Sequence, residues 1–160
     1  MKSITYNEVS TDEIVEIIAK HTQKYNTDEN RVIIGTDSQN FCKTKIVIVI
    51  ALHTVGKGGI FFYDILNVPR IDNIRQKLIT ETQISLKYAE ELISNFESYY
   101  EKTGYDYTKL GFTIHVDAGY NGPTRNVIPE ISGWIKSCGF DCVVKPESFV
   151  ASSIADRITK

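Results

Sequence analysis

Residues 34–39 read IGTDSQ, and they continue an apolar segment that begins at residues 31–33, RVI. This segment is typical of a strand that enters a protein core, so the aspartate that follows it, Asp37, needs an explanation. Aspartate is a common turn residue, because its side chain hydrogen-bonds to nearby backbone groups. It is also a ligand for hard divalent cations. The remaining sequence favours the second interpretation.

The composition indicates an ordinary globular protein that forms a single domain over residues 1–160. The chain has 42% hydrophobic and 24% charged residues and a formal net charge of −2. This charge excludes strong nucleic-acid binding through the overall field, which would require a basic balance. The longest apolar run, Ile46 to Leu52, is far too short to span a bilayer. We therefore expect a cytoplasmic protein without a membrane partner.

The hydrophobic periodicity predicts alternating helices and strands. Residues 10–13, STDE, have the spacing of a capping box before isoleucines at helical intervals, so residues 1–30 are expected to be an N-terminal helical extension with a helix over 11–25. Strands are predicted over 31–37, 43–54, 60–68, 110–117 and 140–146, and helices over 71–102, 129–138 and 148–160. This order predicts an α/β fold with a mixed five-stranded sheet and helices on both faces.

Acidic residues occur where such a sheet would bind a ligand. Asp37 and Asp117 end the first and fourth predicted strands, and in open α/β sheets ligands bind at the carboxyl ends of the strands. Glu81 lies within roughly 60° of Leu78 on the long helix, on its apolar side. A carboxylate in that position is costly unless it is paired, hydrogen-bonded or bound to a cation. Asp156, in the last predicted helix, would add a fourth acid.

Converging carboxylates repel one another, and their oxygens suit Mg²⁺ or Mn²⁺. Two such ions about 4 Å apart can activate water and stabilise the leaving oxygen in phosphodiester cleavage. The four acids therefore predict a site for divalent metal.

The order of elements, with these acids on the first strand, the long helix, the fourth strand and the last helix, resembles the ribonuclease H-like superfamily. The stretches IGTDSQ, IHVDAG and KPESFVASSIADRITK are similar to the YkuK-like group of small bacterial proteins within it. The resemblance implies a two-metal nuclease acting on nucleic acid, in which Asp37 bridges two Mg²⁺ or Mn²⁺ ions and Glu81, Asp117 and Asp156 are further ligands. The chain has no counterpart of the basic helix with which ribonuclease H proper holds a hybrid duplex, so the resemblance does not specify RNA or DNA.

Each acid also has a purely structural interpretation. Asp37 and Asp117 could cap turns, Glu81 could pair with a neighbouring basic residue, and Asp156 could complete a capping box with Ser153. Seven basic residues could form a phosphate-binding rim or simply a solvated surface: Arg70, Arg75, Lys77, Arg125, Lys145, Arg157 and Lys160. The alternative function is accordingly a non-catalytic module that keeps the fold and binds nucleic acid or a protein.

Overall fold

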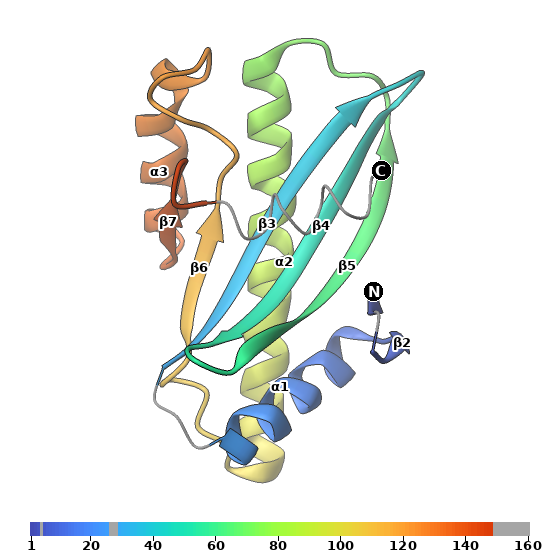
Figure 1. Cartoon of the computed structure of the whole chain (residues 1–160), viewed down its shortest axis with the longest axis vertical. Helices are drawn as coiled ribbons and strands as arrows, with labels where there is room; N and C mark the ends of the chain where they lie inside the picture. The colour runs from blue at the N-terminus through green and yellow to red at the C-terminus, as the bar shows by residue number, and fades with distance from the viewer. Residues whose placement is uncertain (4, 26–28, 149–160) are drawn as a thin grey trace.

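A mixed seven-stranded sheet forms the centre of the molecule (Figure 1). The structure is a computed structural model that describes residues 1–3, 5–25 and 29–148. The strands are β1 (Lys2–Ser3), β2 (Asn7–Glu8), β3 (Asn30–Asn40), β4 (Thr44–Thr54), β5 (Gly58–Val68), β6 (Gly111–His115) and β7 (Asp141–Val143). Their order across the sheet is β2-β1-β5-β4-β3-β6-β7. The antiparallel meander of β3, β4 and β5 is extended on its β3 side by the parallel strands β6 and β7.

All five predicted strands are present, as β3 to β7, but the predicted count of five is two too few. The additional strands, β1 and β2, are two residues long and extend the β5 edge, where Lys2 pairs with Tyr63. Two residues are too short to show the alternation by which strands are recognised. The predicted end of the first strand at Asp37 is also wrong, because β3 continues to Asn40 through its pairing with β4.

The helices are α1 (Thr11–Tyr25), α2 (Ile74–Thr103) and α3 (Ile128–Ser137), with a single 3-10 turn, η1 (Arg125–Val127), before α3. The predicted capping box begins α1: Glu13 N donates to Ser10 Oγ at 3.3 Å, and Ser10 N donates to Glu13 Oε2 at 2.7 Å. Asn73 caps α2 by accepting a hydrogen bond from Gln76 N, and Gly104, at a φ of 73°, ends it. These caps define the two ends of the 30-residue helix.

The sheet separates two clusters of buried apolar side chains. The larger cluster contains side chains of all three helices together with Val32, Ile34 and Ile114 of the sheet. The smaller one lies on the other face and is centred on Val47 and Val49 of β4. Both faces of β4 are thus buried, as its unbroken β-branched sequence predicts.

All three described helices contribute to the larger cluster, and α2 runs along the back of the sheet in Figure 1. Within the described residues the helices therefore cover one face of the sheet, whereas the sequence predicted helices on both. The helix predicted over 148–160 lies, apart from its first residue, outside the described residues. None of the helices in the described ranges is long and apolar enough to cross a membrane.

Candidate functional site

The direction of strand succession reverses between β3 and β6, and Asp37 and Asp117 lie at this point. The two strands are parallel neighbours, and the last paired residues are Gly35 and His115. Asp37 and Asp117 each follow two residues after this pair, so they occupy equivalent positions at the carboxyl end of the sheet. A reversal of strand order at that end is the usual place for a ligand in an α/β sheet.

Beyond His115 the chain is no longer paired with β3, and it continues alongside the end of β7 and the residues that follow β7. Val116 N donates to Val143 O at 2.9 Å, and Lys145 N donates to Ala118 O at 2.8 Å. This pairing brings the Lys145 ammonium within 2.5 Å of Asp117 Oδ1. The contact is an ion pair outside hydrogen-bonding geometry, since no described residue donates a hydrogen bond to this buried oxygen.

Glu81, on α2, lies at the same end of the sheet as Asp37 and Asp117. Its side chain is only 8% exposed, and it accepts a hydrogen bond from Ser38 Oγ. Thr36, on the same side of β3, donates from Oγ1 to the backbone oxygen of Glu81 at 3.2 Å. The pKa of Glu81 is raised to about 7: burial is the main cause, the negative charges of Asp37 and Asp117 add to the rise, and the bond from Ser38 and the charge of Lys77 oppose it. A proton therefore remains on this carboxyl far above the pH at which an exposed glutamate loses it.

Asp37, Glu81 and Asp117 border one pocket of about 190 Å³, together with Ser38, Lys77, Thr124 and other side chains. The sequence prediction that these three acids converge on one rim agrees with this geometry. Asp156, the fourth predicted ligand, lies outside the described residues.

The three acids border the pocket without forming a finished metal site. Within residues 1–3, 5–25 and 29–148, no three His, Cys, Asp or Glu side chains are close enough together to hold one ion. The alternation of β3 supplies a reason: Thr36 and Ser38 face α2, whereas Asp37 lies opposite Val47, whose side chain belongs to the cluster on the other face. Asp37 and Glu81 thus approach the pocket from different faces of the strand.

The basic residues divide into two groups. Arg70 pairs with Asp72 and Arg75 with Glu130, each at 2.7 Å, and these pairs are exposed. Lys77 and Lys145 border pockets at the acidic residues, which distinguishes them from the solvated surface charges. Arg125, at the start of η1, is exposed and borders neither of these pockets, and Arg157 and Lys160 lie outside the described residues.

Two polar residues that the sequence analysis did not single out, Ser38 and Thr36, hold Glu81 in place. Their position could have been predicted, because residues at i and i+2 on a strand share one face. His115, on β6, is buried, and its burial holds its pKa below the usual value. It is therefore a neutral core residue at pH 7.

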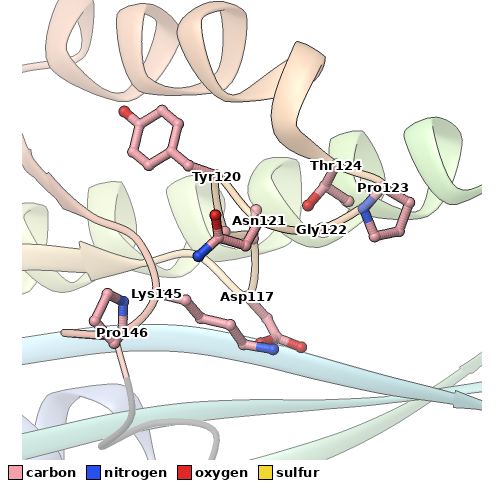
Figure 2. A pocket seen from close by; sticks show the side chains of 10 residues that line it. Asp117, Tyr120, Asn121, Gly122, Pro123, Thr124, Lys145 and Pro146 are labelled. Carbon is pink, nitrogen blue, oxygen red and sulfur yellow. The ribbon is translucent and has the colours of Figure 1, made fainter.

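A second, larger pocket of about 500 Å³ adjoins the first and shares Asp117 and Thr124 with it. It is bordered by the loop over residues 117–124 and by Lys145 and Pro146. Figure 2 shows the Lys145 side chain extended toward Asp117, with Tyr120 and Asn121 projecting from the loop. The loop is rich in Gly, Asn and Pro, which are typical turn residues, and the sequence analysis assigned no function to it.

Comparison with known proteins bears on the family of the chain. A family model described as "Ribonuclease H-like" matches residues 13–160. A relative from Bacillus subtilis (strain 168), "Uncharacterized protein YkuK", is 31% identical over 160 residues, with 96% of this chain and 92% of that protein covered.

Among solved structures, two of the Mos1 transposase catalytic domain with Raltegravir, one with Mn and one with Mg, are each 11% identical to this chain. Their TM-scores are 0.29 and 0.26; the matches cover 85% of this chain and 62% and 63% of those chains. At such TM-scores the likeness carries no functional conclusion. The match of the family model and the 31% identity over nearly the whole length, in contrast, show that this chain belongs to the ribonuclease H-like family and, within it, to the YkuK-like group.

Proposed function

We propose that the protein hydrolyses phosphodiester bonds of nucleic acid with the help of Mg²⁺ or Mn²⁺ ions, two in number, bound by Asp37, Glu81, Asp117 and Asp156. One observation carries the proposal: carboxyl groups from β3, from α2 and from the end of β6 border a single small pocket where the strand order reverses. Membership in the ribonuclease H-like family supports a role connected with nucleic acid.

The chemistry of the carboxyl groups suits a divalent cation. Asp117 Oδ1 is buried, accepts no hydrogen bond from a described residue, and already has a cationic group, the Lys145 ammonium, beside it. The pKa of Glu81 is raised in part by Asp37 and Asp117, so the three acids repel one another. A cation would relieve this repulsion and draw the side chains closer together, whereas hard oxygen ligands exclude the softer metals.

A bound divalent cation would lower the pKa of a water ligand and neutralise charge on the phosphate. Lys77 and Lys145 would orient the phosphate, because both border the pockets that meet at Asp117. Ser38 holds the carboxyl group of Glu81 through its hydrogen bond. Because a proton competes for Glu81 up to about pH 7, metal affinity should increase as the pH rises towards and through that value and level off above it.

A non-catalytic nucleic-acid or protein-binding module is the second candidate, and one observation favours it. The Lys145 ammonium already neutralises Asp117, and the described acids are not close enough to hold an ion as they stand. In such a module Lys145 would remain on Asp117 and metal would have no effect on stability.

Metal-dependent cleavage and metal-dependent stability test the proposal together. Wild type should cleave single- or double-stranded oligonucleotides in millimolar Mn²⁺, and Glu81→Gln should not. Glu90→Gln is the matched control, since Glu90 is exposed on the same helix, nine residues further along. A cleavage rate that was equal in the two variants would contradict the assignment of Glu81.

Thermal melts separate metal binding from catalysis. A ligand at 100 times its dissociation constant stabilises the folded state by about 2.7 kcal/mol, so Mn²⁺ should raise the melting temperature above that in EDTA. Asp37→Asn should abolish this shift while leaving the metal-free melting temperature unchanged or higher, because it removes one of several like charges. Identical wild-type midpoints in Mn²⁺ and EDTA would refute the metal site.

The role of Asp156 is a separate part of the proposal. If Asp156 is a ligand, Asp156→Asn should weaken Mn²⁺ binding, and Ser153→Ala should lower only stability, by about 1 kcal/mol for a lost cap. If the two residues instead form a capping box, both variants should lower stability, and their metal titrations should match that of wild type.

A further inference from the structure

We propose that the 500 Å³ pocket bordered by residues 117–124, Lys145 and Pro146 binds one nucleotide unit of a single strand, with its base on Tyr120 and its phosphate at Lys145. The inference rests on the proposed function for the class of its ligand. It extends that function by assigning a binding site that lies beside the acidic pocket.

The volumes of the two pockets indicate different contents. The acidic pocket, at about 190 Å³, is below the 300–1,000 Å³ that is usual for organic ligands, so it suits ions and a phosphate group. The neighbouring pocket, at about 500 Å³, is within that range. Because the two share Asp117 and Thr124, a nucleotide in the larger pocket would place its phosphate next to the acids.

The side chains of the larger pocket have the groups that a nucleotide requires. Tyr120 is 59% exposed and gives an aromatic face on which a base can stack, and stacking of this kind tolerates any base. The Asn121 amide has both donors and an acceptor for a base edge. The Lys145 ammonium lies toward the acidic end of the pocket, beside Asp117, while Tyr120 projects from the loop elsewhere on its border (Figure 2).

The loop that carries Tyr120 and Asn121 is held in its shape by its own backbone. Gly122 N donates to Gly119 O at 3.2 Å, and Arg125 N donates to Gly122 O at 3.2 Å. A Cβ at Gly119 would lie 3.3 Å from Lys145 Cβ, so glycine allows the lysine to lie close against the loop. The backbone that carries Tyr120 therefore lies against Lys145 before a ligand binds, which lowers the entropy cost of ordering the loop.

Equilibrium binding in EDTA tests the site independently of metal and cleavage. The probe is a 5′-fluorescein single-stranded oligonucleotide of mixed sequence at low salt, followed by fluorescence anisotropy. Tyr120→Ala should weaken binding about fivefold or more, the lower limit for loss of one base stack. Tyr120→Phe should bind within about twofold of wild type, because the ring remains. Tyr100→Ala is the matched control, since Tyr100 is 52% exposed at the far end of α2.

Competition identifies the unit that the pocket holds. A nucleoside 5′-monophosphate should displace the oligonucleotide from wild type, and ribose 5-phosphate, which has no base, should do so much more weakly. If an unlabelled oligonucleotide displaced the probe and the nucleoside 5′-monophosphate did not, the site would require a strand. That result would overturn the assignment of a single-nucleotide pocket.

Two further results would overturn the inference: no oligonucleotide binding at low salt, or equal weakening by Tyr120→Ala and Tyr100→Ala. The result of this binding test can be distinguished from the result of the test of the proposed nuclease function. Binding that depends on Tyr120 without metal-dependent cleavage would support the pocket and reject the nuclease, and cleavage that is insensitive to Tyr120 would do the reverse.

Discussion

Replacement of Glu81 by glutamine should stabilise the protein at pH 8 in the absence of metal. The pKa of Glu81 is raised from 4.5 to about 7, mainly because its side chain is buried. At 1.36 kcal/mol for each pH unit, this difference corresponds to about 3 kcal/mol. Glutamine has the shape of the protonated acid, and its oxygen can still accept the hydrogen bond from Ser38.

The sign of the effect follows from proton linkage. Between pH 4.5 and 7 the folded state binds a proton at Glu81 that the unfolded state has released, so wild-type stability falls as the pH rises through this window. Above pH 7 the carboxyl is ionised in both states, and the loss is complete. The stability of Glu81→Gln relative to wild type should thus increase by about 3 kcal/mol from pH 4.5 to pH 7 and then remain constant.

Urea unfolding of the two proteins in EDTA, at intervals from pH 4 to pH 8.5, measures this difference directly. Other titrating groups cancel when the variant is compared with wild type at each pH. Glu90→Gln, on the exposed side of the same helix, is the matched control for the loss of one carboxyl group. A flat difference between Glu81→Gln and wild type over the whole range would refute the argument that burial and like charge act on Glu81.

Two further predictions concern the Lys145 side of the site. Lys145→Gln removes the ammonium that occupies Asp117, so Mn²⁺ should stabilise this variant more than it stabilises wild type; a smaller shift in the melt would contradict competition between the two cations. Gly119→Ala should cost about 1–2 kcal/mol in urea unfolding, because its Cβ would lie 3.3 Å from Lys145 Cβ. Gly133→Ala, where a Cβ meets nothing within 4 Å in α3, should instead stabilise by about 0.5–1 kcal/mol.

The sequence was sufficient to predict the order of the main elements, because each has a local signature. The capping box at residues 10–13 and the unbroken helical period over 71–102 agree with α1 and α2 to within a few residues at each end. Glu81 was predicted to face the core from its angular position alone, and it is buried. Ile74, four residues before Leu78 and therefore on the same side of the helix, is 49% exposed at the first position of α2.

Long-range contacts could not be predicted from such local signatures. The pair between Lys145 and Asp117 depends on the parallel pairing beyond β7, which only the assembled sheet brings about. The continuation of β3 past Asp37 likewise depends on its partner β4. For this reason the sequence analysis named Lys145 only as one of seven basic residues of a possible rim, without its contact to Asp117. It also did not predict that Asp37 and Glu81 approach the pocket from different sides of β3.

The buried carboxyl group of Glu81 destabilises the folded state near neutral pH, and this cost is a reason to expect a bound cation. Burying Glu81 beside Asp37 and Asp117 destabilises the ionised form, and the bond from Ser38 offsets only part of that cost. A glutamine would keep the same shape and the same bond without the charge. The acid gains an advantage over the amide only when something binds the ionised carboxylate, and a divalent cation is the species that hard oxygen ligands bind best. If the pH dependence predicted for Glu81 is found in EDTA and disappears in Mn²⁺, the cost and its compensation will have been measured on the same carboxyl group.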